Sequence, residues 1–450
     1  MNIPRHILAY EKKFADNRRP LISSELGGLE QAVVIPALAE KSSLFSTIAC
    51  LSRNSPVELK RTLVLCVINN RGSHNTSTGD IEDNRETIRY LRALIKGLPC
   101  EFVEGKELSA HMKDISSSPL RLACIDASSP GSEMPDNAGG VGAARKIGLD
   151  AALTVFDYGT ADDKLLFCLD ADTLVADNYL KEVRSFFDKE VKAAAVVNYS
   201  HQRPATSHRR LAIGAYEIFL RYYVLGLRYA GSPYAFHTIG SAMVCTADAY
   251  VAIGGMNRRD AAEDFYFLNK LAKYTEVGRI TNTTVYPSAR LSRRVPFGTG
   301  RRMVRFMEGG EDEFLLYDPR VFLILKKWLG MMKSFPDRRT EEILIQAGKI
   351  DPLLLSFLEG NDFFETWERI RKNTKNSKGL LRHFHFWFDA FKTMKLIHFL
   401  TERGIPQADM FRALEKLMSW MGGQDLLCSG LRISSPDRIE SSSLTATALL

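Results

Sequence analysis

The sequence predicts an α/β protein with a doubly wound, mostly parallel sheet and a helical C-terminal region. Short, nearly continuous apolar runs alternate with segments of helical periodicity, which is typical of parallel strands covered on both faces. After about residue 311 the pattern changes to long amphipathic helices through 421. With 450 residues, the chain is long enough for one large domain and a smaller one.

The predicted elements follow one another in the order of a wound sheet. Residues 127–140 are rich in Ser, Pro and Gly and indicate a loop, and Asp260 is available as the N-cap of a later helix. Strands are predicted at 32–35 (stopped by Pro36), 63–68, 122–125, 165–169, 193–198 and 239–245, and helices at 41–53, 82–96, 141–155 and from 261. The predicted division is a lead-in at 1–30, a sheet domain at 31–310, a helical region at 311–428 and a disordered Ser-rich tail at 429–450.

Composition excludes several classes of protein. The net charge of +7 is mild for this length. The sequence contains no basic arm with interleaved aromatic residues, so it does not predict nucleic-acid binding. The seven cysteines show no C-x-x-C spacing, which indicates reduced thiols in a cytosolic protein and not a zinc site. No stretch reaches about 18 apolar residues, so we expect no transmembrane helix, and no signal peptide is evident.

The most informative stretch is LLFCLDADTLV, residues 165–175. A buried strand there ends in Asp170-Ala171-Asp172, and the carboxyl ends of strands are where ligands bind in open α/β sheets. Two carboxylates at such an end can turn toward one hard cation, Mg²⁺ or Mn²⁺. Water and a diphosphate would complete the coordination shell of that cation. Alone, the residues are equally compatible with a polar strand end that is followed by a turn.

Four further groups stand in order around this stretch. They are Pro36-Ala37-Leu38-Ala39-Glu40 after the first strand, the helix GVGAARKIGLDAAL at 140–153, the segment GSAMVCTADAYVAIGGMN at 240–257, and AAEDFYFLNKL at 261–271. This ordered set resembles the family 2 glycosyltransferases, which have the GT-A fold, and it covers residues 33–275.

The resemblance implies transfer of a sugar from a nucleotide diphosphate sugar (a UDP- or GDP-sugar) to a saccharide, lipid or small-molecule acceptor. A metal ion would stabilise the leaving diphosphate, with Asp172 as direct ligand and Asp170 on the ribose or the metal. Glu263 and Asp264 match the family's base motif, with Asp264 as the general base of an inverting displacement. As an alternative, both acids are simply favoured at a helix N-terminus. The residues implied for donor binding are Pro36, Glu40, Asn70, Arg145, Lys146, Asp170 and Arg301.

The sequence departs from the family pattern in three places. The second strand ends in Asn69-Asn70-Arg71-Gly72 and not in acidic residues, so the base, uracil or guanine, stays open. Lys146 stands where the family usually has Asn, which would place a positive charge near the phosphates or the sugar. The acceptor motif Q-x-x-R-W is absent after 275, which puts processive polymer synthesis in doubt.

An arginine cluster stands in place of that acceptor motif. Arginine forks suit phosphate, and the glycines of Gly298-Thr299-Gly300 would let the segment close over the nucleotide. A solvated basic surface is the alternative for any single member. The cluster consists of Arg290, Arg293, Arg294, Arg301, Arg302 and Arg305.

Three other functions stay open from the sequence. A retaining transferase that acts on a small acidic acceptor would share the fold and the D-x-D motif. A sugar-phosphate nucleotidyltransferase usually has a Gly-rich loop after the first strand, where this chain has PALAEKSS. A non-catalytic scaffold would use the basic face and the terminal helices to bind a partner. We expect a cytoplasmic location, with the helices of 311–421 as the segment for any peripheral attachment to the inner face of the membrane.

Overall fold

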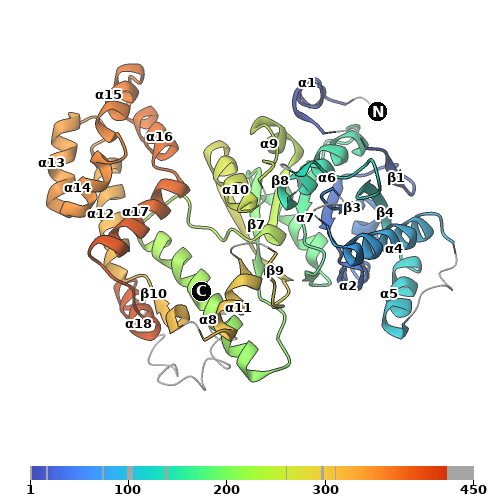
Figure 1. Ribbon diagram of the computed structural model, residues 1–450. Coiled ribbons are helices and arrows are strands. Elements are labelled where there is room, and N and C mark those ends of the chain that lie inside the picture. Colours follow the sequence, from blue (N-terminus) through green and yellow to red (C-terminus); the bar gives the residue numbers. More distant parts are fainter. Residues whose placement is uncertain are drawn as a thin grey trace. The chain divides into compact units, whose positions relative to one another are not determined.

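The computed structural model describes residues 3–16, 19–72, 76–98, 105–136, 140–259, 261–294, 298–309 and 311–422 (Figure 1). Contacts divide the chain into two compact units. Unit 1 consists of Met1–Gln202 and Thr238–Ser288, and unit 2 consists of Arg203–His237 and Ala289–Leu450. Asp260 and the predicted tail at 429–450 lie outside the described residues.

Unit 1 contains the sheet and the helices that cover it. Its elements are α1 (Arg5–Phe14), β1 (Leu21–Ser23), β2 (Gln31–Ala37), α2 (Lys41–Leu51), α3 (Pro56–Lys60), β3 (Thr62–Asn69), α4 (Thr78–Ile95), α5 (Lys106–Ser116), β4 (Arg121–Ala127), α6 (Val141–Val155), β5 (Leu165–Cys168), β6 (Leu174–Val175), α7 (Tyr179–Lys189), β7 (Ala194–Tyr199), the short 3₁₀ helix η3 (Gly240–Ala242), β8 (Met243–Thr246), α9 (Ala247–Ala252), α10 (Glu263–Tyr274) and β9 (Val277–Tyr286).

The described strands of unit 1 form one nine-stranded sheet in the order β1-β4-β3-β2-β5-β8-β7-β9-β6. Parallel ladders join β4 to β3, β3 to β2, β2 to β5 and β7 to β9. The strands β1, β8 and β6 run antiparallel to their neighbours in shorter ladders. Most of the paired residues therefore lie in parallel ladders, as the near-continuous apolar runs predict.

Helices cover both faces of this sheet. The chain steps outward from β2 to β3 and β4, and then returns to the other side of β2 at β5. Because crossovers between parallel strands are right-handed, this reversal places α6 on the face opposite α2 and α4. Close packing confirms the contact of α6 with the sheet, since a side chain at Gly148 would collide with Val34 and Val67. The predicted α/β fold class with a doubly wound, mostly parallel sheet is thereby confirmed.

The prediction that Pro36 stops the first strand is wrong, because β2 continues through Pro36 to Ala37. The even-numbered residues of β2 bond toward β5, as the bond from the Leu169 N–H to the Val34 carbonyl shows. The β5 ladder ends at the pair Val34–Cys168, whereas the β3 ladder continues to the pair Ala37–Ile68. Pro36 therefore lies where the pairing with β5 ends, although proline is normally excluded from central strands.

Other boundaries differ more modestly from the predictions. The strand predicted at 239–245 begins with the turn η3, and only Met243–Thr246 is extended. The helix predicted from 261 begins at Glu263 and follows Ala262, whose φ of +56° is left-handed. The ten-residue strand β9 and the edge strand β1 were not predicted, and β1 lies in the expected lead-in.

Unit 2 is mainly helical. Its elements are α8 (Ser207–Tyr229), α11 (Thr299–Met307), the 3₁₀ helix η4 (Glu311–Phe314), β10 (Leu315–Leu316), α12 (Pro319–Ser334), α13 (Thr340–Ile350), α14 (Pro352–Glu359), α15 (Phe363–Asn373), α16 (Ser377–Trp387), α17 (Ala390–Arg403), β11 (Ala408–Asp409) and α18 (Met410–Trp420).

The core of unit 2 explains why its boundary differs from the predicted one at 310/311. The segment 203–237, expected in the sheet domain, contributes α8 to the same core as α12. The ring of Tyr222 packs edge-on against Phe322, and Trp328 in α12 contacts Phe384 and Phe388 of the aromatic stretch near 384–388. In the sequence, α8 stands between two strands of unit 1, and its position there does not indicate that it belongs to the core of unit 2.

The described residues also bear on two composition-based predictions. Five described cysteines, Cys50, Cys66, Cys124, Cys168 and Cys245, are unpaired thiols, and burial raises their pKa values. Over the same described part of the chain, no helix is both long enough and apolar enough to cross a bilayer.

Candidate functional site

The candidate site lies where the strand order of unit 1 reverses, between β2 and β5. In open α/β sheets such a switch point leaves a crevice beyond the carboxyl ends of the two strands. Four predicted groups meet around this edge: the turn after β2, the aspartates after β5, Arg145 of α6, and the first residues of α10. Motifs that are far apart along the chain thus lie close together in space.

The turn that carries Asp170 and Asp172 is fixed through its backbone. The Leu169 N–H donates to the Val34 carbonyl at 3.1 Å, and the Thr173 N–H donates to the Asp170 carbonyl at 3.1 Å. The hydroxyl of Thr47 in α2 donates to the Ala171 carbonyl at 2.9 Å. With Ala171 buried and both aspartates partly exposed, the turn holds its two carboxylates at the surface of the crevice.

Gln202 supports the same turn from the segment after β7. Its side-chain amide donates to the carbonyls of Asp172 and Tyr286, each at 2.8 Å. Sequence reasoning missed both Gln202 and Thr47, because each acts on backbone carbonyls across more than 20 residues of sequence and leaves no local pattern.

Arg145 joins the two acidic motifs. Its guanidinium forms ion pairs with Asp170 through one terminal nitrogen and with Glu263 through the other. Arg145 is 2% exposed and packs against Gly240, where a side chain would collide with it. The pairing raises the pKa of Arg145 despite the opposing effect of burial, so the charge is permanent. Such bidentate use of a buried guanidinium fixes the distance between the D-x-D turn and α10.

The carboxylate of Asp264 has a raised pKa. Burial and then the negative charge of Glu263 raise the pKa of Asp264 to about 7, while Arg145 and the Phe265 N–H act in the opposite direction. The Phe265 N–H donates to its carboxylate at 2.7 Å. Three carboxylates, on Asp170, Glu263 and Asp264, face one guanidinium, so the cluster favours a proton or a cation.

Left-handed backbone directly precedes two of the predicted site residues, Glu40 and Glu263. Among the described residues, three non-glycine residues have a positive φ: Ala39 at +50°, Ala262 at +56° and Asp362 at +54°. Ala39 precedes Glu40, and Ala262 precedes Glu263. A non-glycine residue in this region costs about 1–3 kcal/mol, and such strain clusters at functional sites. The strain is supported locally, since the side chain of Asn257 donates to the Glu263 carbonyl at 2.9 Å.

The turn after β2 is held by Asn84, a residue that sequence reasoning missed. The Ala39 N–H donates to its side-chain oxygen at 2.9 Å, and its amide donates to the Asn69 carbonyl at 3.2 Å. Asn84 thereby ties the end of β2 to the end of β3. The sequence did contain a signal for Asn84. Asn is unfavourable in helix interiors, and Asn84 lies within the predicted helix 82–96.

The other predicted donor-binding residues of unit 1 lie at the same edge. Glu40 is 7% exposed and begins α2, and Pro36 lies in the β2 end described above. Asn70 is 2% exposed after β3, and its amide donates to the Arg71 carbonyl at 2.9 Å. Its side-chain oxygen is buried and has no hydrogen-bond partner among the described residues.

Lys146, which was predicted to lie near the donor, takes part in a second ionic network, and its contact with a donor stays a prediction. Its ammonium pairs with Asp150 at 2.9 Å and donates to the Tyr10 hydroxyl at 2.9 Å. The hydroxyls of Tyr10 and Tyr250 each donate to Asp150 at 2.8 Å. One residue along a helix rotates a side chain by about 100°, so Lys146 faces α1 and α9 while Arg145 faces the sheet edge. This network is also absent from the sequence-based predictions.

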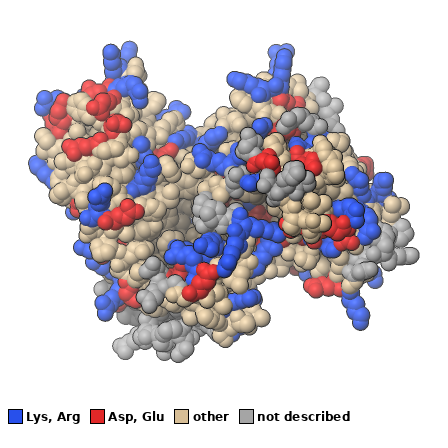
Figure 2. Space-filling view, viewed as in Figure 1, with Lys and Arg blue, Asp and Glu red and all other residues tan. Residues whose placement is uncertain are grey.

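The predicted arginine cluster belongs to unit 2. There Arg302 and Arg305 pair with the buried Glu313 at 2.7 Å and 3.3 Å, and Arg293 pairs with Glu308. Figure 2 shows Lys and Arg side chains gathered over α11. These carboxylates give part of the cluster a structural explanation. The contact of Arg301 with a donor stays a prediction.

The residues present fit a metal ion only in part. Among the described residues, no three His, Cys, Asp or Glu side chains are grouped as a protein-only metal site requires. Asp170 and Asp172 offer hard carboxylate oxygens, which suit Mg²⁺ or Mn²⁺, but one oxygen of Asp170 already pairs with Arg145. The pair therefore fits an ion that takes its remaining ligands from phosphate and water. The buried hydroxyl of Thr173 and the Nε of Arg145, both without a partner in the described structure, mark further unfilled bonding capacity at this edge.

Comparison with known proteins gives a fold-level likeness. No protein-family model matches the chain, and no curated protein matches its sequence. One similar solved structure is S. aureus TarS 1–349 in complex with UDP-GlcNAc, with 14% identity, a TM-score of 0.39, and coverage of 77% of this chain and 92% of that chain. Another is the mannosyltransferase PcManGT from Pyrobaculum calidifontis in complex with GDP-Man and Mn²⁺, with 12% identity, a TM-score of 0.36, and coverage of 98% and 91%. Identities and TM-scores are low, and no conclusion about this chain's substrates rests on them.

Proposed function

We propose that unit 1 transfers a sugar from a nucleotide diphosphate sugar to a saccharide, lipid or small-molecule acceptor, as a glycosyltransferase of the family 2 kind. The observation that supports it most is the cluster at the switch point, where Asp264, Glu263, Asp170 and Arg145 meet. A UDP- or GDP-sugar is the donor class proposed. The five motifs in family order and the GT-A fold class agree with this site.

Asp264 is the proposed general base. A base works best when its pKa lies near the working pH, and the pKa of Asp264 is raised to about 7. Asp264 lies in the first turn of α10 and is half-buried, not fully buried, so we expect an acceptor hydroxyl to reach it. Removal of the hydroxyl proton by Asp264, on the face opposite the leaving diphosphate, gives an inverting displacement. Glu263 serves as a positioning residue, because it is buried and paired with Arg145.

Asp172 and Asp170 are the proposed holders of Mg²⁺ or Mn²⁺. When bound, the ion would act as a Lewis acid that stabilises the charge gained by the leaving diphosphate. The hydrogen bonds to the carbonyls of Ala171 and Asp172 fix the backbone of the turn that carries the two carboxylates. Arg145 holds Asp170 in place and keeps part of the local negative charge neutralised.

The proposal is tested by donor cleavage, which needs no knowledge of the acceptor. The protein is incubated with a panel of UDP- and GDP-sugars and Mn²⁺ or Mg²⁺, and the released nucleoside diphosphate is measured. We expect slow release from one donor class, its loss with a chelator, and wild-type release by Asp162→Asn, a control on the exposed segment before β5. Release from no donor would contradict the proposal. A product of retained anomeric configuration would contradict Asp264 as the base.

A further inference from the structure

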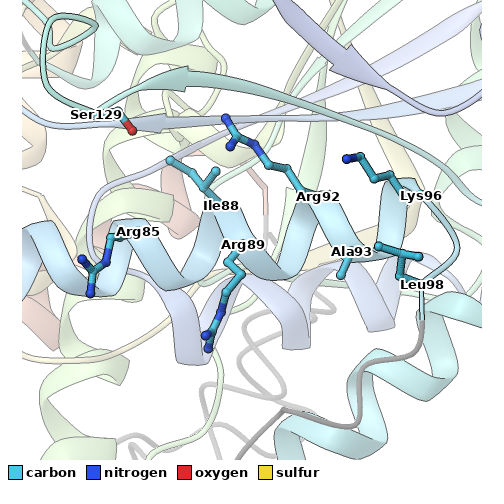
Figure 3. A pocket seen from close by; sticks show the side chains of 8 residues that line it. All are labelled: Arg85, Ile88, Arg89, Arg92, Ala93, Lys96, Leu98 and Ser129. Carbon is cyan, nitrogen blue, oxygen red and sulfur yellow. The ribbon is translucent and has the colours of Figure 1, made fainter.

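A groove of about 480 Å³ runs over α4, away from the cluster at the switch point (Figure 3). Among the described residues, its lining is basic and apolar and includes no acidic side chain. The lining residues are Arg85, Ile88, Arg89, Arg92, Ala93, Lys96, Leu98 and Ser129. None of these residues is part of the proposed active site, and α4 lies on the sheet face opposite Arg145 of α6.

The four cations are spaced along one helix. From Arg85 to Lys96 the helix rises by about 16 Å at about 1.5 Å per residue. Figure 3 shows Arg92 and Lys96 extending from one side of α4, together with Ile88, and Arg89 extending from the other side. Ile88 and Ala93, each 5% exposed, contribute buried apolar surface to the lining. This arrangement suits an extended ligand that has anionic groups at intervals.

The guanidinium groups retain bonding capacity. Arg85 pairs with Glu82 at 2.7 Å, Arg89 with Glu86 at 3.6 Å and Arg92 with Asp126 at 3.7 Å. The three arginine side chains are 76%, 55% and 47% exposed in these pairs. Exposed ion pairs contribute little free energy, and each guanidinium has five N–H donors. A multivalent anion can therefore bind without displacing a strong interaction.

One side of the groove is held in place by the end of β4. Asp126 accepts hydrogen bonds from the backbone and hydroxyl groups of Ser128 and Ser129. These bonds lower the pKa of Asp126 although burial opposes them, so its carboxylate stays charged next to Arg92. Arg92 thus stands at a fixed edge, which reduces the side-chain freedom lost on binding.

We propose that this groove binds a soluble, chain-like anion carrying two or more phosphate groups. Arginine forks suit phosphate geometry, and the four cations are spread along about 16 Å of helix, which is farther than a single phosphate reaches. A flat bilayer is disfavoured because the cations line a hollow. Among the described lining residues, Leu98, which is 53% exposed, is the one large apolar side chain that could insert into a membrane. Single-stranded nucleic acid is disfavoured because none of the described lining residues is aromatic. The inference is independent of the proposed function.

Inorganic tripolyphosphate is the probe, measured by calorimetry on the full chain without divalent ions, with inorganic phosphate for comparison. We expect tripolyphosphate to bind more tightly than phosphate, with affinity that falls as salt rises. The double variant Arg89→Gln/Arg92→Gln should bind at least about tenfold more weakly. The charge-matched control Lys181→Gln/Lys189→Gln on exposed positions of α7 should bind as wild type does.

Failure of the proposal is distinguishable from misfolding and from other sites. Lys96→Gln, an exposed single change, should weaken binding as well and is the second variant if the double variant unfolds. No binding of tripolyphosphate, or an equal loss in the α7 control, would overturn the proposal. Co-sedimentation with phosphatidylcholine–phosphatidylglycerol vesicles should be absent. Vesicle binding that disappears in the groove variant would overturn the assignment to a soluble ligand.

Discussion

Two buried ionic networks start from adjacent residues of α6, and their difference separates a reactive site from a structural one. Lys146 and Asp150 form a closed network with one cation and one anion, and Asp150 is fully buried under the hydroxyls of Tyr10 and Tyr250 and the Asp16 N–H. Arg145 instead faces Asp170, Glu263 and Asp264 in an open network.

The open network is unbalanced in charge and in hydrogen bonding. Three carboxylates share one guanidinium, the Asp170 side chain is 35% exposed, and the Nε of Arg145 lacks a partner in the described structure. The closed network has no such deficit, because Asp150 receives bonds from four groups. A deficit of positive charge raises a carboxylate pKa and attracts cations, so chemistry belongs to the Arg145 network.

The largest expected effect is on turnover in Asp264→Asn. Loss of a general base typically slows turnover by about 10²- to 10⁴-fold, because the amide cannot accept the proton. Donor affinity should stay within experimental error, since the change keeps the shape of the side chain. Donor cleavage rates and donor binding are measured on the same preparation. Unchanged turnover would remove Asp264 from the mechanism.

Loss of either cation should destabilise the fold, but only one loss should alter the chemistry. Arg145→Gln and Lys146→Gln each leave buried carboxylate unpaired, which typically costs about 3–5 kcal/mol in urea unfolding. Because Arg145 lowers the pKa of Asp264, Arg145→Gln should move the acidic limb of the pH–rate profile to higher pH. Lys146→Gln should leave this limb in place. A shift in both variants would contradict the separation of the two networks.

The pH dependence of stability should report on Asp264. Its pKa in the folded chain, about 7, lies above the ordinary 3.8, so between these values the folded chain binds more protons than the unfolded chain. The free energy of unfolding should therefore fall as pH rises through this window, by at most about 1.4 kcal/mol per pH unit. Asp264→Asn should lack this component when both proteins are unfolded by urea at either end of the window. Parallel curves would show that the folded-state pKa is not raised.

The smallest expected effect concerns the closed network. Tyr10→Phe removes a hydroxyl that donates to Asp150 and accepts from Lys146, and should lower the free energy of unfolding by about 1–2 kcal/mol. Turnover should change little, because the hydroxyl lies in the other network. Tyr274→Phe, at a 54% exposed position, is the matched control and should change stability by less than about 0.5 kcal/mol. A larger loss of turnover than of stability would connect α1 to catalysis.

The sequence predicted the fold class and the motifs that meet, because both depend on local patterns. Apolar runs locate the strands, and the acids that follow β5 and those that begin α10 are visible as short motifs. The partners of Lys146 were not predicted because adjacent helix positions face different neighbours, and only the structure shows that α1 lies beside it. The extension of β2 through Pro36 and the insertion of α8 likewise depend on where neighbouring elements end, which no local pattern records.

The most direct test of the account is the thermal unfolding of the protein with UDP and with GDP, each with and without Mn²⁺. For one nucleotide we predict a metal-dependent stabilisation, about 2.7 kcal/mol at 100 times the dissociation constant. Asp172→Asn should lose it, whereas Asp177→Asn, at an exposed position after the same turn, should keep it. Stabilisation that is equal with and without metal, or equal in the two variants, would contradict a nucleotide diphosphate site built on the D-x-D turn.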